Sequence, residues 1–373
     1  MTSSTRINFL GNLRAFVVLL VIVLHGALTY MVNPPTWWYV IDRQNHPLFT
    51  TLVLLIDVPI MQIMFFISGY FALPSLQKRG AAGFSREKFM RIGLPWLAGV
   101  LLLAPPTTYL IYLSRAVPVS LLDFWRRDFW GELFQQSVYW YLGVLLALFL
   151  LLALVYESSE RLRKLAVEPA RPGWKVFVGF GAVMTASYFF LNLFYHVDSW
   201  NHFWYLFLFQ PVRLPLYAGY FCLGLFAQQK GWFGPGGYVP QAAGWLAACA
   251  LSGLLYLGLR FSPLMAPVDP LPAVKLYNAI LFNTFCLSSL MGLLAVFQAR
   301  VSGDGRIWTS LSNSSYGMYF FHPVILYPLT LVLLLVDLPA LLKGSLAIVL
   351  GIGLSWLFVS QVVRRLPWLR DVF

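Results

Sequence analysis

The segment Phe9–Tyr30, FLGNLRAFVVLLVIVLHGALTY, is the most informative part of this chain about its fold. It is long enough to cross a bilayer as one α-helix. Within it, Arg14 and His25 are costly in an apolar setting, and such residues mark function by default. Their spacing corresponds to about 1100° of helical rotation, so they share one face within roughly 20° and lie about 16 Å apart along the axis. One helix face therefore offers a fixed cation in one leaflet and a titratable imidazole in the other.

The composition of the whole chain agrees with this first segment. Of its 373 residues, 59% are hydrophobic and only 11% are charged, and the mean hydropathy is +0.72. Soluble domains carry about 25% charged residues, so we expect a polytopic membrane protein. The net charge of +12 is typical of basic loops on one membrane face, not of nucleic-acid binding. Cys222, Cys249 and Cys286 all lie in apolar segments, which favours packing roles over a disulfide or metal site.

Hydropathy predicts an all-α bundle of about ten transmembrane helices, forming a single domain over residues 1–373 with no fused soluble domain. The expected spans are 7–32, 49–74, 92–114, 137–156, 174–195, 203–228, 242–260, 274–299, 313–336 and 343–363. With the N-terminus inside, 17 of the 26 Lys and Arg residues fall in cytoplasmic segments and 7 in outer ones. This asymmetry predicts that both termini are cytoplasmic. Arg14 then lies in the cytoplasmic leaflet and His25 in the outer one.

Asp57 is the first candidate partner for His25. Asp57 is about eight residues into the second span, so both side chains are expected roughly 10–12 Å below the outer surface. A carboxylate at that depth could fix the tautomer of His25 and support it as a general base. In the alternative interpretation, Asp57 faces a water-filled vestibule and His25 is a structural histidine.

A basic segment follows the second span. It contains five cations and one acid, Glu87; the cations are Lys78, Arg79, Arg86, Lys88 and Arg91. Such a cluster suits the phosphate groups of a cytoplasmic ligand. Ordinary positive-inside charge with anionic lipid contact is the equally weighted alternative.

Two further ionisable residues fall within apolar spans. Arg213, expected near the middle of the span 203–228, must face the interior or water, and could hold a carboxylate of a side chain or of a substrate. His322 lies directly before Pro323, which frees a carbonyl group on the preceding helical turn, so a polar site or a structural kink is expected there. His196, Asp198 and His202 leave a metal site open, although their spacing is not diagnostic.

Aromatic residues gather at the expected outer ends of the spans; they are Trp37, Trp38, Tyr39, Tyr139, Trp140 and Tyr141. Aromatic rings can hold sugars, but anchoring at the membrane interface is the commoner reason for such belts.

Taken in order along the chain, these blocks resemble the acyltransferase-3 family of bacterial membrane acyltransferases. The resemblance rests on the spacing of Arg14 and His25, FFISGYF at 65–71, FMRIGLPWL at 89–97, YWYL at 139–142 and NSSYGMYFFHP at 313–323. The closing RRLPWLRDVF resembles members that succinylate osmoregulated periplasmic glucans. Two positions depart from the family pattern. Gly11 stands where an Asp is common, so Asn8 or Asn12 would have to brace Arg14, and Lys88 replaces the first Arg of an Arg-x-x-Arg pair.

The resemblance implies an O-acyltransferase of the bacterial inner membrane, with acyl-CoA as the cytoplasmic donor substrate, a glycan acceptor outside, and no permanently bound cofactor or metal. Catalytic roles would fall to His25, Arg14 and Asp57. Acyl-CoA would be bound by Ser68, Lys78, Arg79, Arg86, Lys88 and Arg91, and the acceptor would be bound or supported by Trp140, Arg213, His322 and Tyr319. Either a general base or a transient acyl carrier is open for His25. A proton-coupled transporter or flippase is the alternative function, and the oligomeric state stays open.

Overall fold

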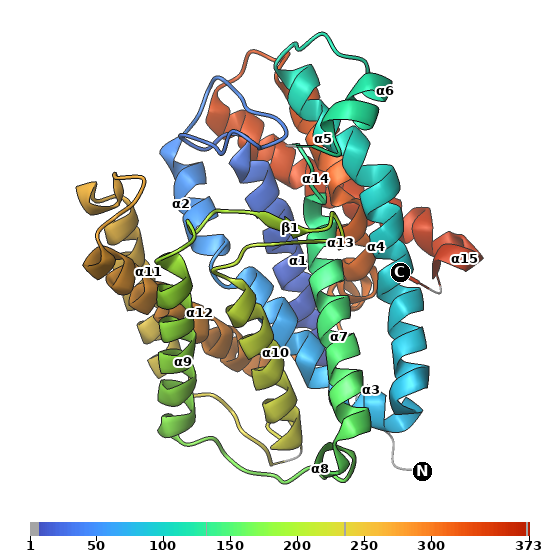
Figure 1. The fold of residues 1–373 in the computed structure, drawn as a ribbon, viewed down its shortest axis with the longest axis vertical. Helices are drawn as coiled ribbons and strands as arrows, with labels where there is room; N and C mark the ends of the chain where they lie inside the picture. The colour runs from blue at the N-terminus through green and yellow to red at the C-terminus, as the bar shows by residue number, and fades with distance from the viewer. Residues whose placement is uncertain (1–6, 132, 235, 371) are drawn as a thin grey trace.

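The computed structural model describes residues 7–131, 133–234, 236–370 and 372–373. It is a helical bundle with one small antiparallel hairpin, in which β1 (Asn201–Phe203) pairs with β2 (Phe207–Phe209) (Figure 1). The longer helices are α1 (Asn8–Leu28), α2 (Pro47–Ile56), α3 (Ile60–Lys88), α5 (Ala104–Ser114), α7 (Trp140–Ser158), α9 (Trp174–Asn192), α10 (Leu214–Gln229), α11 (Ala242–Arg260), α12 (Pro272–Arg300), α13 (Arg306–Leu333) and α14 (Ala340–Gln361). Short helices are α4 (Leu94–Ala98), α6 (Leu121–Asp123), α8 (Glu160–Arg163) and α15 (Pro367–Arg370). Three π-helical turns (Phe89–Gly93, Gly99–Leu103, Phe124–Asp128) and three 3₁₀ turns (Ser137–Tyr139, Pro263–Met265, Val363–Arg365) complete the described elements.

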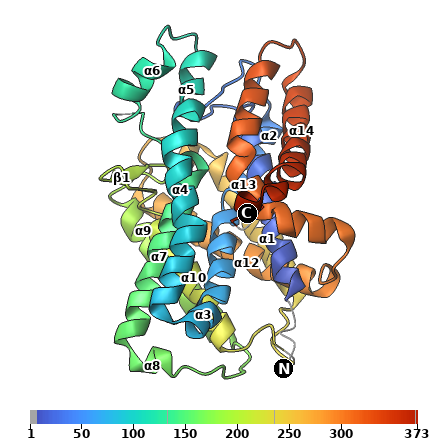
Figure 2. The same ribbon diagram turned by 90° about the vertical axis from the view of Figure 1, so that its right-hand side faces the viewer.

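The prediction of an all-α polytopic membrane protein is confirmed. In the described part of the chain, eight helical segments are long and apolar enough to cross a membrane. One of them, Pro47–Ser114, contains two expected spans, because the chain turns at Gly80, whose φ of 70° favours glycine. Figures 1 and 2 show α3 descending to the end of the bundle that holds α8, and α4 and α5 climbing back. Helix α10, with 16 residues, corresponds to the remaining expected span.

The expected span 203–228 is wrong over residues 203–213. Residues 201–209 form the β-hairpin, whose turn places Trp204 and Tyr205 at positive φ, and α10 begins only at Leu214. The two prolines explain the difference, since Pro211 disfavours a helical residue before it and Pro215 is placed to start a helix. Arg213 is therefore the residue before α10, not a residue in the middle of a span.

Helix α1 lies at the centre of the bundle and packs against α2, α3, α12, α13 and α14. Both of its ionisable side chains reach α13: Arg14 Nη2 donates to Ser312 O at 3.4 Å, and His25 Nδ1 lies 2.8 Å from His322 Nε2. The predicted common face is confirmed. Because Arg14 and His25 meet Ser312 and His322 in the same order, α1 and α13 run parallel, as the first and ninth spans of the predicted bundle would.

The outer helices have the surface expected for lipid contact. Only 17%, 22% and 28% of the most apolar stretches of α9, α11 and α14 are buried. Large apolar side chains face outward there, including Val178 and Leu251, which are 59% and 62% exposed. A surface of this kind and extent on a soluble monomer would be exceptional. It fits helices whose backbone groups are satisfied internally while their side chains meet hydrocarbon.

Helices α3 and α10 approach each other unusually closely. A Cβ atom on Gly69 would lie 2.0 Å from Phe221 O, and one on Gly224 would lie 2.1 Å from Phe66 O. Two glycines on opposite helices thus allow the backbones to touch, as small residues do in membrane helix pairs. This crossing fixes α10, and with it Arg213, against the helix that follows Asp57.

Candidate active site

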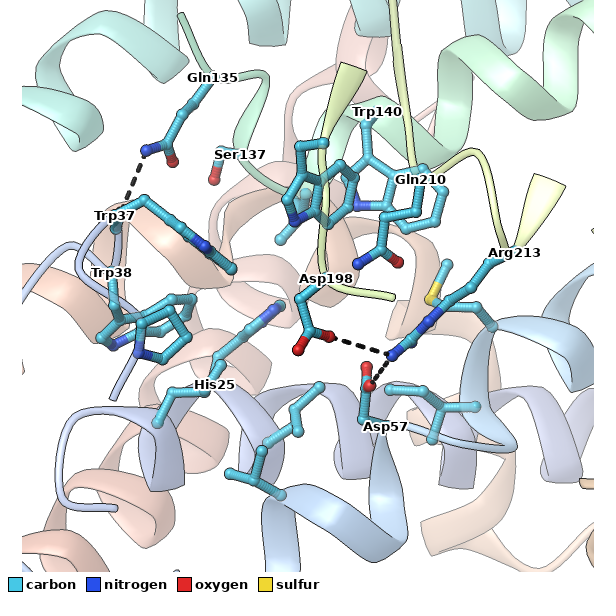
Figure 3. A pocket seen from close by; sticks show the side chains of 18 of the residues that line it. His25, Trp37, Trp38, Asp57, Gln135, Ser137, Trp140, Asp198, Gln210 and Arg213 are labelled. Carbon is cyan, nitrogen blue, oxygen red and sulfur yellow. Dashed lines mark hydrogen bonds and ion pairs between the residues drawn. The ribbon is translucent and has the colours of Figure 1, made fainter. Parts of the chain in front are cut away.

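A cavity of about 660 Å³ opens between α1, α2, α10, α12 and α13 under the β-hairpin. This volume is in the range typical of ligand sites. Figure 3 shows His25, Asp57, Asp198 and Arg213 around it, with tryptophans on its walls. The polar and tryptophan residues that line it include His25, Trp37, Trp38, Asp57, Gln135, Ser137, Trp140, Asp198, Trp200, His202, Gln210, Arg213 and Arg260. The cavity therefore joins residues from almost the whole length of the chain.

His25 and His322 form a hydrogen-bonded pair at this cavity. Their Nδ1 and Nε2 atoms are 2.8 Å apart, their ring planes differ by 11°, and their ring centroids are 5.1 Å apart. His322 is fully buried, whereas His25 is half-buried and lines the cavity. In the described part of the chain, Nε2 of His25 has no hydrogen-bond partner. The imidazole of His25 is thus held at one nitrogen and open at the other.

The predicted pairing of Asp57 with His25 is wrong. Asp57 Oδ2 accepts a hydrogen bond from Arg213 Nη2 at 2.6 Å, and the same Nη2 lies 3.9 Å from Asp198 Oδ1 (Figure 3). The depth predicted for Asp57 does bring it to the same cavity as His25. However, the start of α10 places the guanidinium of Arg213 beside the carboxylate of Asp57. A buried cation needs a counter-ion, and Asp57 supplies it.

Two interruptions of helical structure meet at this ion pair. Asp57 ends α2, and Val58 and Pro59 separate it from α3, while Arg213 precedes α10. Non-helical backbone at membrane depth is tolerated where it lines a cavity. Pro59 is the sequence signal for the first break and Pro215 for the second, and neither entered the sequence prediction.

Aromatic side chains form the walls of the cavity. Trp38 stacks on His25 with centroids 5.5 Å and planes 23° apart, and Tyr327 meets His25 edge-on. Trp140 packs against Trp200 at 5.3 Å between centroids. Three buried polar atoms at the cavity have no partner in the described chain: Trp200 Nε1, Arg213 Nε and Ser137 Oγ. Aromatic rings with polar side chains between them suit a ligand rich in hydroxyl groups.

The segment that carries Trp37 and Trp38 is tied down from several sides. Arg115 Nη2 donates to Thr36 O at 2.8 Å and to Trp38 O at 3.2 Å. Lys343 Nζ lies 2.6 Å from Asp42 Oδ2, and both side chains are 4% exposed. Burial raises the pKa of Tyr39, so its hydroxyl stays a neutral donor. The tryptophans are consequently presented on a fixed frame.

Arg14 lies away from the cavity and is exposed at the other half of α1. Asn12, one of the two residues expected to brace it, turns its amide nitrogen elsewhere, since Asn12 Nδ2 donates to Val301 O at 2.8 Å and to Gly303 O at 3.1 Å. A Cβ atom on Gly11 would meet Ser312 Oγ at 2.9 Å. An Asp at position 11 would therefore need the Ser312 hydroxyl group to turn away from α1.

Ser68 belongs to a chain of polar aromatic contacts that leads to His25. Ser68 Oγ lies 3.1 Å from Tyr141 OH, the Tyr141 and Tyr319 rings are 5.5 Å apart, and Tyr319 lies 6.1 Å from His322 by ring centroids. Tyr319 OH donates to Val138 O. Of the predicted acceptor or supporting residues, Trp140, Arg213 and Tyr319 line the cavity, and His322 contacts it through His25.

The basic segment is helical rather than a loop, because α3 continues to Lys88 after the turn at Gly80. Its single acid, Glu87, lies 3.0 Å from Arg79, 3.7 Å from Arg91 and 4.0 Å from Lys88. The Lys88 ammonium also lies 5.0 Å from the Phe149 ring centre. Lys78 and Arg86 are exposed. One carboxylate thus gathers three cations at the end of the bundle opposite α6, where Figure 2 shows the lower end of α3.

Sequence reasoning missed the partnership of His25 with His322 and the contributions of Gln135 and Gln210, because these carried no local signal. It also did not show that Asp198 faces Arg213 or that His202 stacks on Tyr205, with ring centroids 4.4 Å apart. Among the described residues, no three His, Cys, Asp or Glu side chains lie together as metal ligands.

Comparison with known proteins identifies the family of the chain. The model of the acyltransferase 3 family, described as an acyltransferase domain, matches residues 7–360. Neither the curated proteins nor the solved structures give a match to the chain. The matched range contains both histidines of the cavity, the ion pair and the basic segment. The chain therefore belongs to the acyltransferase 3 family and is a membrane acyltransferase.

Proposed function

We propose that this acyltransferase moves an acetyl or succinyl group from cytoplasmic acyl-CoA to a hydroxyl group of a carbohydrate on the outer side of a bacterial inner membrane. The observation that supports this most strongly is the position of His25. It lies at an aromatic cavity with one imidazole nitrogen held by His322 and the other open. A histidine presented in this way can take a proton from a hydroxyl group or carry an acyl group.

The donor would be bound at the basic end of the bundle. Arg79, Lys88 and Arg91 gather around Glu87, and the exposed Lys78 and Arg86 add uncompensated charge. Phosphate groups of CoA would compete with Glu87 for these cations. Because Lys cannot form the bidentate contact that Arg makes, Lys88 would act as a point charge.

The acyl end of the donor would pass from Ser68 toward His25. Ser68, Tyr141, Tyr319 and His322 form a continuous line of contacts between these two positions, and their polar groups would lie along the path of the acyl chain. Arg14, exposed at the cytoplasmic half of α1, would guide the pantetheine arm. The distance of about 16 Å along α1 between Arg14 and His25 would then be covered by the arm and not by movement of the protein.

The acceptor would occupy the cavity of about 660 Å³. Trp140 and Trp37 would lie against sugar rings, while Asp57 and Asp198, 36% and 51% exposed, would accept hydrogen bonds from hydroxyl groups. Arg213 would have a supporting role, because its charge is already compensated by Asp57. The succinyl group is proposed only from the chain ending RRLPWLRDVF.

Turnover of a labelled donor tests this function. The purified protein is incubated with acyl-labelled acetyl-CoA or succinyl-CoA, with and without a periplasmic-type glucan, and label in the glucan is measured. We expect transfer from at least one donor, and loss of about 100-fold or more in His25→Ala. The matched control is His46→Asn, which keeps the cap that His46 supplies to α2. Failure to bind or turn over either thioester would exclude the proposed donor.

The same assay separates the two roles of His25. Without acceptor, a burst of free CoA equal to the enzyme concentration, with label retained on the protein, indicates an acyl carrier. CoA release that strictly requires acceptor indicates a general base.

A further inference from the structure

We infer that His322 is a positioning residue that fixes His25 in the tautomer protonated on Nδ1 and so keeps the Nε2 lone pair of His25 available at the cavity. The chemical use of that lone pair rests on the proposed function, but the tautomer itself follows from contacts within the chain. Three links, from the backbone of α13 to the cavity, carry the inference.

The first link is a backbone carbonyl group in α13. Residue 323 would normally donate its N–H to the carbonyl of residue 319, four positions earlier, but Pro323 has no N–H. Nδ1 of His322 lies 2.8 Å from Tyr319 O and 3.2 Å from Met318 O. A carbonyl oxygen only accepts hydrogen bonds, so His322 carries a proton on Nδ1.

The second link is the contact between the imidazoles. A neutral His322 with its proton on Nδ1 has a lone pair on Nε2, which lies 2.8 Å from Nδ1 of His25. His25 must therefore donate from Nδ1. A doubly protonated His322 would be a fully buried cation whose hydrogen-bond partners are carbonyl groups and an imidazole. No carboxylate contacts either imidazole in the described chain, because Asp57 is bound to Arg213, and a buried charge without a counter-ion is costly.

The third link is the open nitrogen of His25. With the proton on Nδ1, Nε2 is an acceptor, and this atom has no partner in the part of the chain that the structure describes. The titratable rings nearby are Tyr327, which contacts His25, and Tyr319, which contacts His322. Trp38 covers one face of the imidazole and Tyr327 its edge, so the ring has little freedom to turn over.

In the general-base route, His25 Nε2 takes the proton of the acceptor hydroxyl as its oxygen attacks the thioester carbonyl. The new C–O bond forms, the C–S bond breaks, and the imidazolium returns the proton to the leaving thiolate. In the carrier route, Nε2 attacks the carbonyl, the CoA thiolate leaves, and the acceptor oxygen then displaces the acyl group from nitrogen while its proton goes to the thiolate. Both routes need the Nε2 lone pair that His322 preserves.

The tautomer can be measured without any substrate. The chain has five histidines, so the imidazole ¹⁵N resonances of the protein in detergent can be assigned from single His→Asn variants. We expect His25 to be protonated on Nδ1 and bare on Nε2 in the wild type, and to lose this preference in His322→Leu. A wild-type His25 protonated on Nε2, or an unchanged tautomer in His322→Leu, would overturn the inference whether or not the proposed reaction occurs.

Activity of three variants provides the second test. In His322→Gln, the amide oxygen can lie near the former position of Nε2 and accept from His25 Nδ1. In His322→Asn, the shorter amide reaches only the former position of Nδ1, and His322→Leu offers no acceptor. We expect Asn and Leu to lower kcat by about 100-fold with little change in KM, and Gln to lose about tenfold or less. The pH–rate profile of the His322→Gln variant should resemble that of the wild type. Equal losses in Gln and Asn would show a purely structural role for His322.

Discussion

At the scale of single residues, the cavity separates its costly polar groups into two independent pairs. His25 is held by His322, and Arg213 is held by Asp57 with Asp198 beside it. Each pair satisfies groups that would otherwise be buried without partners. The division matters for function, because the imidazole is not coupled to a carboxylate and the carboxylates stay directed at the cavity.

The first prediction concerns Asp57. In Asp57→Asn, the buried guanidinium of Arg213 (8% exposed) loses its main counter-charge, and we expect a loss of up to about 3 kcal/mol in the free energy of unfolding. Asp198→Asn is the matched control, because Asp198 lies farther from Arg213 and its side chain is half exposed. This variant should lower the free energy of unfolding by less than about 1 kcal/mol. Thermal unfolding in detergent measures both.

The pH–rate profile of folded Asp57→Asn should stay like that of the wild type. A shifted profile would mean that Asp57 tunes His25 after all, and would contradict the pairing with Arg213.

The second prediction concerns Trp140. Its ring lines the cavity and packs against Trp200 and Tyr217, so in Trp140→Ala the KM for the glycan acceptor should rise about tenfold, equivalent to about 1.4 kcal/mol. The KM for acyl-CoA should not change, because this residue lies on the acceptor side. Trp174→Ala is the control, because the Trp174 side chain is 70% exposed at the start of α9. Equal effects on the two KM values would remove Trp140 from the acceptor site.

At the scale of secondary structure, the site depends on where helices stop. The break at Asp57–Pro59 and the late start of α10 bring a carboxylate and a guanidinium together from residues 156 positions apart. Pro323 acts differently, since it leaves α13 continuous but frees one carbonyl group for His322. Prolines thus contribute to both polar pairs, by ending or starting helices at Asp57 and Arg213 and by freeing the carbonyl group that orients His322.

The third prediction concerns the crossing of α3 and α10. Gly69→Ala would place Cβ 2.0 Å from Phe221 O, so the backbones must separate, at a cost of about 1–3 kcal/mol or more. Gly179→Ala, in the interior of α9 with nothing within 4 Å of the added Cβ, should instead stabilise by about 0.5–1 kcal/mol. Comparable thermal shifts in the two variants would show that the close approach is not needed.

At the scale of the whole molecule, the bundle places a basic end and an aromatic cavity at opposite ends of α1. Arg14 and His25 meet the parallel helix α13 near these two ends. A reaction that uses a donor from one compartment and an acceptor from the other needs such a bridge. The family match to residues 7–360 covers both ends, and under the proposed function the reaction would join the two sides of the membrane.

The fourth prediction concerns membrane orientation. In a cysteine-free background, Arg86→Cys should react with an impermeant maleimide only from the cytoplasmic side, and Arg126→Cys only from outside. Both residues are exposed. The end of α3 that carries Arg86 and the turn after α6 that carries Arg126 lie at opposite ends of the bundle (Figure 1), and basic segments favour the cytoplasm. Labelling of inside-out and right-side-out vesicles measures this. Labelling of both cysteines from one side would overturn the orientation.

The class of the protein and the position of most helices could be predicted from the sequence. Hydropathy depends on local composition, so α7, α9, α11 and α12 begin and end within a few residues of the predicted bounds. The common face of Arg14 and His25 followed from helical geometry alone. The carbonyl freed by Pro323 was also readable from sequence, because its cause lies within one helical turn.

The pairing of the polar groups, in contrast, depends on how the helices pack. His25 was expected beside Asp57 and lies beside His322, and Arg213 was expected in the middle of a span and lies before α10. Hydropathy gives the depth of a residue but not its rotation about the bundle or its neighbours. Pairing joins residues 156 and 297 positions apart, and it is set by helix packing and by the requirement that every buried polar group find a partner.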